Sequence, residues 1–200
     1  MTLHDEGHWA TYNDAQQGRD VRPLCKEVLA LAGDGGGRTA VDFGCGLGKE
    51  TRAMLSAGWR VHAIDGEPGT RERVLRTVDE ADRPRLTVQT TRFADLTALP
   101  EADLVYAGFA LPYVAPADFP RIWRLVLASL RPGALVAGNL FGVRDSWADD
   151  PLLTFLTETA ARELFDGLEV LSFVEVDEDG QASTGPKHWH VFDVVARRHG

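Results

Sequence analysis

The chain has 200 residues, of which 44% are hydrophobic, and a formal net charge of −9 at pH 7. This length is sufficient for one domain with a full hydrophobic core. The 21 lysines and arginines are scattered and outnumbered by 30 acidic residues, which argues against binding to a nucleic-acid backbone. There is no apolar run of the roughly 20 residues that a membrane span requires, and the first residues lack the features of an export signal. We therefore expect a cytoplasmic protein whose two cysteines, Cys25 and Cys45, are reduced.

Helix and strand patterns alternate along most of the chain. A predicted helix at 20–32 precedes a glycine-rich linker at 34–37. The following predicted elements are strand 39–43, helix 48–57, strand 60–64, helix 68–81, strands 86–91 and 103–107, helix 118–130, strand 134–140 and a helical stretch near 151–165. Strands 168–176 and 188–197 come last, with no helix between them, which is typical of an antiparallel hairpin.

This order of elements predicts an α/β fold, Rossmann-like, with a mostly parallel seven-stranded sheet and helices on both faces. The C-terminal hairpin closes the sheet. We expect a single domain over residues 1–200, in which residues 1–37 form an N-terminal helical cap segment and residues 38–200 form the core.

The most informative stretch is the glycine loop that follows the first predicted strand. Asp42 stands just before Gly44, Gly46 and Gly48, and glycine lets the backbone pass close to a ligand in conformations that a Cβ would forbid. The second strand ends at Asp65, the position from which an acid holds ribose hydroxyls in Rossmann-like folds. Together the two features predict a nucleoside site.

Two details distinguish between nucleoside ligands. The dinucleotide fingerprint requires a third glycine where this chain has Lys49. A carboxylate at Asp42 would repel a pyrophosphate but suits a ligand with an ammonium and a sulfonium group. The pattern therefore fits S-adenosylmethionine better than NAD, and an NAD-dependent oxidoreductase remains the alternative.

The chain resembles the class I S-adenosylmethionine-dependent methyltransferases. The similarity is carried by D-F-G-C-G-L-G at 42–48, V-H-A-I-D-G-E at 61–67, F-A-D-L at 93–96 and L-R-P-G at 130–133. Within that superfamily it is most similar to the small bacterial tellurite-resistance-type branch, through F-G-V-R-D-S-W at 141–147 and K-H-W-H-V-F at 187–192.

The expected cofactor is S-adenosyl-L-methionine, with S-adenosyl-L-homocysteine as product. Strand ends place the glycine loop near its methionine part and Asp65 near its ribose. The resemblance implies that Asp95 and the backbone of Ala94 recognise the adenine, whereas the plain alternative for Asp95 is a helix cap. The expected cofactor-binding residues are Trp9, Arg19, Asp42, Gly44, Gly46, Gly48, Asp65, Gly66, Glu67, Ala94, Asp95 and Phe109.

Residues beyond the same sheet edge are expected to bind the methyl acceptor. These are Tyr12, Tyr113, Arg144 and Trp147, with ordinary packing or a solvated charge as the alternatives. His188 and His190 lie two apart in the last strand and so point to one side of the sheet, with Trp189 on the other. They are the candidate catalytic bases, or else partly buried strand residues. No metal site is predicted, because no third ligand at a recognisable spacing accompanies them.

We therefore predict an enzyme that transfers a methyl group from S-adenosylmethionine to a small-molecule acceptor by in-line displacement. A catalytic base is needed only for a protic amine or hydroxyl acceptor, not for a thiolate or a tellurite-like oxyanion. We expect no nucleic-acid or membrane partner, and a monomer or homodimer. A non-catalytic cofactor-binding protein is the third alternative.

Overall fold

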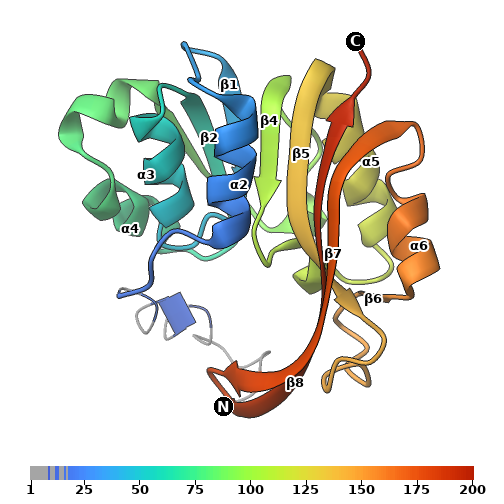
Figure 1. Ribbon diagram of the computed structural model, residues 1–200. Helices are drawn as coiled ribbons and strands as arrows, with labels where there is room; N and C mark the ends of the chain where they lie inside the picture. Colours follow the sequence, from blue (N-terminus) through green and yellow to red (C-terminus); the bar gives the residue numbers. More distant parts are fainter. Residues whose placement is uncertain (1–8, 10–11, 14–15, 17) are drawn as a thin grey trace.

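The computed structural model describes residues 9, 12–13, 16 and 18–200, and the N-terminal stretch 1–8 lies outside the described residues. One sheet of eight strands forms the centre of the molecule (Figure 1). Its strands are β1 Thr39–Phe43, β2 Arg60–Asp65, β3 Leu86–Thr90, β4 Ala102–Ala107, β5 Leu130–Gly142, β6 Phe155–Leu156, β7 Leu168–Ala182 and β8 Gly185–Arg198.

The strand order is β3-β2-β1-β4-β5-β8-β7, and the short β6 pairs with β5 beside this path. Strands β1 to β6 pair in parallel, whereas β8 is antiparallel to both β5 and β7. The predicted Rossmann-like, mostly parallel fold with a closing antiparallel hairpin is confirmed. The order reverses between β1 and β4, and ligands bind in such sheets beyond the carboxyl ends of the strands at that point.

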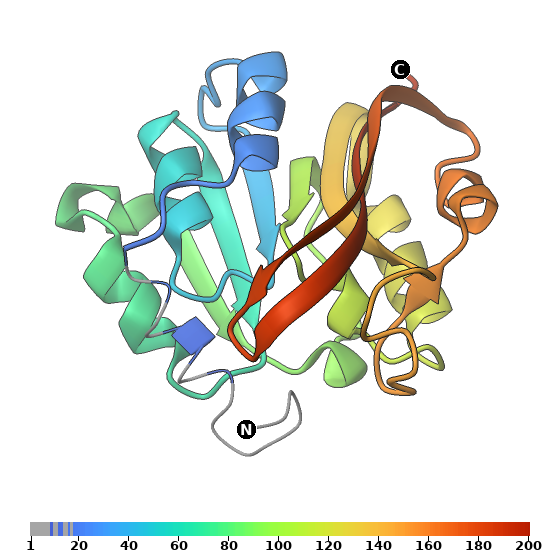
Figure 2. The same ribbon diagram turned by 60° about the horizontal axis from the view of Figure 1, so that its bottom comes forward.

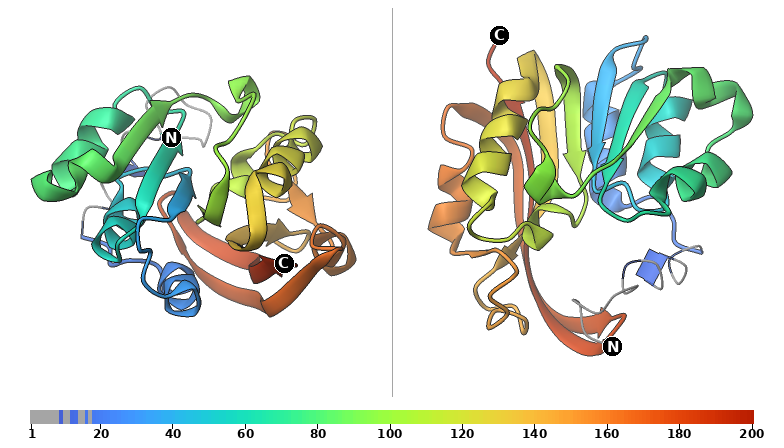
Figure 3. Two further views of the ribbon diagram at one scale, coloured as in Figure 1. Left: turned by 90° about the horizontal axis from the view of Figure 1, so that it is seen from above. Right: turned by 180° about the vertical axis from the view of Figure 1, so that it is seen from behind.

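Helices cover both faces of the sheet (Figure 3). Helices α2 Pro23–Ala32, α3 Lys49–Ser56 and α4 Thr70–Thr77 contribute buried apolar side chains to one core, which includes Trp59. Helices α5 Phe119–Ser129 and α6 Glu158–Glu163 belong to the other core, with Phe43 and Phe192. Alternate residues of a strand point to opposite faces, so each buried strand serves both cores. Short 3-10 helices span Glu80–Arg85, Phe93–Asp95 and Leu111–Tyr113.

Three predictions differ from the structure. The predicted helix 68–81 is divided into α4, which ends at Thr77, and the 3-10 helix Glu80–Arg85. The helical stretch near 151–165 is helical only at α6, where the Thr157 side chain accepts a hydrogen bond from the Ala160 N–H (3.2 Å) and caps the helix. The acidic segment 177–186 is not a loop: it pairs from Asp177↔His190 to Ala182↔Gly185 and extends the hairpin far beyond the sheet (Figure 1). Oppositely charged side chains face each other across this part of the hairpin, which favours pairing of polar strands.

No helix among the described residues has the length and apolarity to cross a bilayer. Cys25 and Cys45 are both buried free thiols.

Candidate active site

A cavity of about 580 Å³ lies where the strand order reverses, beyond the ends of β1, β2 and β4. Figure 2 looks toward this end of the molecule, where the loops after the parallel strands gather. Described lining residues include Trp9, Tyr12, Arg19, Arg22, Gly44, Cys45, Gly46, Leu47, Glu50, Asp65, Gly66, Glu67, Arg92, Phe93, Phe109, Ala110 and Tyr113.

The glycine loop forms the floor of this cavity. Gly44 and Gly46 line it with φ of 78° and 51°, values that disfavour residues with a side chain. A Cβ at Gly44 would lie 2.3 Å from the Ala110 Cβ. Gly48 (φ 78°) does not line the cavity; a Cβ there would meet the Val74 side chain at 3.1 Å. Gly44 and Gly46 therefore bring backbone to the cavity surface, whereas Gly48 permits close packing of α3 and α4.

Asp65 stands beside this floor. One carboxylate oxygen accepts the Gly46 N–H and the other the Glu67 N–H, both at 2.9 Å. Burial raises the pKa of Asp65, and these hydrogen bonds oppose the shift. Each oxygen keeps a further lone pair for a ligand hydroxyl. Glu67 also lines the cavity, but its carboxylate is paired with Arg73 and accepts the Gly69 N–H.

The cavity wall also contains a partly buried ion pair. The Arg19 guanidinium binds Glu50 through two hydrogen bonds of 2.5 and 2.8 Å, and Glu50 also accepts the Arg22 N–H at 3.0 Å. Burial would raise the pKa of Glu50, but the pairing with Arg19 prevails and the pKa lies below its ordinary value. Arg19 Nε is buried and has no hydrogen-bond partner among the described residues.

Besides Gly48, three predicted cofactor ligands lie outside the cavity lining. Asp42 is 1% exposed and accepts a hydrogen bond from the Thr51 hydroxyl at 2.5 Å, and burial with the nearby Glu50 raises its pKa to about 7. It supports the loop from beneath and does not face the cavity. Asp95 and Ala94 are exposed on the 3-10 turn Phe93–Asp95, whose Phe93 ring lines the cavity. The turn points Phe93 inward, and the next two side chains consequently point outward.

A second cavity, of about 330 Å³, adjoins the first. Its wall includes several aromatic side chains, and the long β7–β8 hairpin supplies Trp189 and Asp193. The predicted acceptor residues Tyr12, Tyr113 and Trp147 all line it. The two cavities share Trp9, Tyr12, Gln16, Arg22, Phe109 and Tyr113.

Phe109 stands at the junction in a left-handed conformation (φ 51°) that residues other than glycine rarely adopt. Its N–H donates to Asn139 Oδ1 at 2.9 Å, and Asn139 Nδ2 donates to Asp193 at 2.5 Å. The Arg22 guanidinium lies 4.6 Å from the centre of the Phe109 ring. A buried polar chain thus fixes the junction between the cavities and ties it to strand β8.

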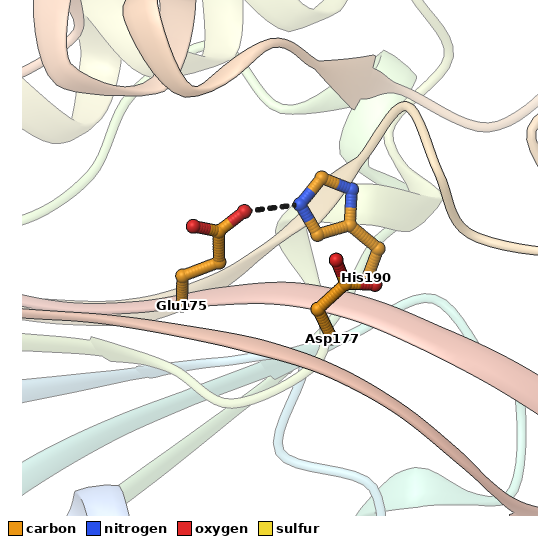
Figure 4. A group of neighbouring side chains, drawn as sticks. All are labelled: Glu175, Asp177 and His190. Carbon is orange, nitrogen blue, oxygen red and sulfur yellow. Dashed lines mark hydrogen bonds and ion pairs between the residues drawn. The ribbon is translucent and has the colours of Figure 1, made fainter.

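The predicted catalytic histidines are correctly placed on one strand face, but that face is turned away from both cavities. His188 binds Asp177 and Asp179 at 2.7 Å each, and hydrogen bonding to these acids raises its pKa. His190 is 1% exposed and its ring contacts Glu175 at 2.9 Å (Figure 4). Trp189, on the other face, lines the second cavity. The histidines therefore do not meet the expected role of a base.

Arg144 is likewise outside the cavities. Its Nε donates to Asp177 at 2.8 Å and its backbone N–H donates to His190 Nδ1 at 2.9 Å. The expected contact of Arg144 with an acceptor is replaced by ion pairs to β7. These pairs join the loop after β5 to the hairpin.

Glu175, Asp177 and His190 place potential metal ligands within 4.8 Å of one another (Figure 4). Glu175 and Asp177 belong to the neighbouring strand β7, and the sequence spacing did not show that they lie close to His190. However, Arg144 already forms ion pairs with both carboxylates. Because His190 Nδ1 accepts the Arg144 N–H, Nε2 carries the ring proton and donates it to Glu175. The group is consistent with an ion-pair network rather than a metal site.

Comparison with known proteins finds a similarity over part of the chain: residues 40–133 match the methyltransferase domain family. The carboxy-S-adenosyl-L-methionine synthase of Yersinia enterocolitica is 34% identical over 112 residues, which are 52% of this chain and 41% of that protein. The chain thus spans only about two fifths of that relative's length.

Solved structures confirm the class I methyltransferase fold. TehB from Haemophilus influenzae superposes with a TM-score of 0.77 at 13% identity, over 96% of this chain and 66% of that one. The Burkholderia thailandensis 1,6-didemethyltoxoflavin-N1-methyltransferase, solved with its substrate and S-adenosylhomocysteine, gives 0.68 at 19% identity, over 96% and 85% of the two chains. The chain therefore has a TehB-like fold.

Several residues that line the cavities, or that join them through hydrogen bonds, were not among the predicted site residues. Glu50 follows the glycine loop directly, and its burial depends on pairing with the distant Arg19. Asn139 and Asp193 are opposite each other in the β5–β8 register, which a sequence without known pairing does not reveal. Trp189 and Asp193 did carry a signal, because both alternate with the two histidines along β8.

Proposed function

We propose that this domain binds S-adenosylmethionine in the 580 Å³ cavity and transfers its methyl group to a small molecule held in the adjoining aromatic cavity. The observation that carries the proposal is the joint position of the glycine floor and Asp65 at the point where the strand order reverses. A cavity of this size and mixed polarity falls within the range of nucleoside and cofactor sites.

The residues present fit the cofactor. Asp65 would accept hydrogen bonds from ribose hydroxyls, and the Phe93 ring, stacked on Phe43 at 4.1 Å, offers an apolar wall for the base. Glu50 and Arg19 would bind the ammonium and carboxylate of the methionine part, where the unpartnered Arg19 Nε lies. The bound cofactor supplies a methyl group on a positively charged sulfur. The protein aligns the acceptor with that methyl group and excludes water.

The comparisons support this proposal. Solved relatives of the same fold are methyltransferases, and NodS from Bradyrhizobium japonicum was also solved with S-adenosylhomocysteine (TM-score 0.67, 17% identity). We extend to this chain a cytoplasmic location, a small-molecule acceptor and a monomeric or homodimeric state. An NAD-dependent oxidoreductase is disfavoured by the hairpin that ends the sheet and by Lys49 in place of the third fingerprint glycine.

A second candidate is handling of a carboxylated S-adenosylmethionine, as the names of the Yersinia relatives suggest for those proteins. Arg22 favours it, because its guanidinium lines both cavities and forms no ion pair with a carboxylate among the described residues. Mass spectrometry of the nucleoside that copurifies with the protein distinguishes the two. S-adenosylmethionine or S-adenosylhomocysteine supports methyl transfer, whereas a carboxylated derivative supports the second candidate.

Calorimetric titration with S-adenosylhomocysteine tests the cofactor site. Asp65→Ala should weaken binding about 10- to 100-fold, because hydrogen bonds to a charged group contribute about 1.5–3 kcal/mol. Asp95→Ala is the matched control, since Asp95 is exposed and outside the lining. Equal affinity of Asp65→Ala and the wild type would contradict the proposed site. Stabilisation by NADH alone would favour the oxidoreductase, and no transfer from a labelled methyl donor to a metabolite extract would favour a non-catalytic binding protein.

A further inference from the structure

The wall of the second cavity is unusual in the flatness of its side chains. Trp147 and Trp189 lie with ring centroids 5.8 Å apart, and Tyr113 packs edge-on against Trp9 at 4.7 Å. Behind the tryptophans the Lys187 ammonium lies 3.9 Å from the Trp147 ring and 4.4 Å from the Trp189 ring. Lys187 is itself buried and paired with Asp145, so the two indoles are fixed from behind. Rigid aromatic walls of this kind favour a planar guest that stacks or packs edge-on.

Asp193 is the half-buried carboxylate in this wall. One of its oxygens is held by Asn139 Nδ2, and the chain from Asn139 continues to the N–H of Phe109 at the junction with the cofactor cavity. The other oxygen has no hydrogen bond to a described residue. The acid is therefore oriented by a fixed partner and keeps one oxygen for a guest, which is the arrangement that a general base requires.

We infer that the methyl acceptor is a planar aromatic molecule with an N–H or O–H group, and that Asp193 accepts the proton of that group during transfer. The inference rests on the proposed methyl transfer and adds the acceptor class and the base. It assigns to Asp193 the role that the sequence analysis gave to His188 and His190.

The proposed transfer needs no reactant other than the acceptor and the cofactor. The acceptor nitrogen or oxygen uses an electron pair to form the bond to the methyl carbon. The carbon–sulfur bond breaks, and its electron pair stays on sulfur, which turns the sulfonium into the neutral thioether of S-adenosylhomocysteine. The acceptor proton passes to the free oxygen of Asp193 and from there to solvent.

The charges of the second cavity favour such an acceptor over an oxyanion. Arg22 is the cationic residue among its described lining residues, whereas Asp193 and the exposed Glu178 are acidic. A small oxyanion bound here would lie among carboxylates and aromatic faces, both of which repel it. Burial also raises the pKa of Asp193, with Glu27 acting in the same direction and Asn139 and Arg22 opposing it, which suits a base for weakly acidic groups.

The test compares acceptors with and without a proton to lose. Benzimidazole and hydroxyquinoline form the protic set, and N-methylbenzimidazole and quinoline form the proton-free set. Methyl transfer from labelled S-adenosylmethionine is measured for the wild type, Asp193→Asn and Asp179→Asn. Asparagine at 193 keeps the oxygen that Asn139 binds, so it removes the base with little change of shape. Asp179 is 92% exposed on the opposite face of the hairpin and serves as the control.

We expect Asp193→Asn to lower kcat for the protic set about 10²- to 10⁴-fold, the usual contribution of a general base. Its rate with the proton-free set should stay within about twofold, as should all rates of Asp179→Asn. With the protic set, the activity of the wild type should fall at low pH as Asp193 becomes protonated, and this fall should be absent in Asp193→Asn. The charges of Arg22 and Glu27 influence the pH at which Asp193 is protonated.

Three results would overturn the inference. The first is that Asp193→Asn turns over the protic set as fast as the wild type does. The second is that Asp193→Asn loses the same factor in kcat with both acceptor sets. The third is that the wild type methylates only thiols or oxyanions such as tellurite. The last result would leave the proposed methyl transfer intact. A wild type that does not bind S-adenosylhomocysteine in calorimetry would instead remove the proposed function itself, and the inference with it.

Discussion

The buried pair of Lys187 and Asp145 allows a quantitative prediction about the C-terminal hairpin. Both side chains are 0% exposed, and Asp145 also accepts the Trp147 N–H at 3.0 Å. Lys187→Met would leave the Asp145 carboxylate buried without its cation, a change that typically destabilises by about 3–5 kcal/mol. For a domain of this length about 1 kcal/mol corresponds to about 2–4 °C, so we expect the melting temperature to fall by about 6–20 °C.

Urea unfolding followed by circular dichroism measures this loss. Lys26→Met is the matched control: Lys26 contacts Asp20 at 2.6 Å, but its side chain is 57% exposed, and exposed pairs contribute little. The double variant Asp145→Asn with Lys187→Met should lose less than the sum of the two single variants, because no unpaired charge remains. Equal unfolding midpoints for Lys187→Met and Lys26→Met would refute the reasoning.

The remaining predictions concern the glycine loop and the histidines. The pKa of Asp42 is raised to about 7, so the folded state holds this proton more tightly than the unfolded state does. The free energy of unfolding should therefore fall as pH rises from about 4 to about 7. The expected slope is up to about 1.4 kcal/mol per pH unit. Urea titrations across this range should show a flatter profile for Asp42→Asn, and parallel profiles would contradict the assignment. Gly48→Ala should destabilise by about 1–3 kcal/mol, measured by urea unfolding, because alanine must adopt a φ of 78° and press on Val74. His188→Ala should keep kcat within about twofold of the wild type in a methyl-transfer assay, since its ring faces away from both cavities; a larger loss would return it to the active site.

Local patterns were sufficient for the sheet and for the floor of the cofactor cavity. The glycines at 44 and 46 and the acid at 65 are fixed by their distance from strand ends, which hydrophobic patterning locates well. Asp42 was harder to place, because a residue one or two positions before the end of a buried strand can point either to the ligand or into the core. Its neighbour Thr51, nine residues along the chain, accounts for the buried position.

The choice of the proposed base could not be made from the sequence alone. Alternation along β8 separates His188 and His190 from Trp189 and Asp193, but it does not say which set faces the ligand. That depends on β8 lying between β5 and β7, and on the hairpin bending over the carboxyl ends of the parallel strands (Figure 2). Histidine suggested catalysis by its chemistry alone, whereas Asp193 faces the aromatic cavity and is held by Asn139. In this domain the orientation of one antiparallel strand therefore decides which of its polar residues can take part in the reaction.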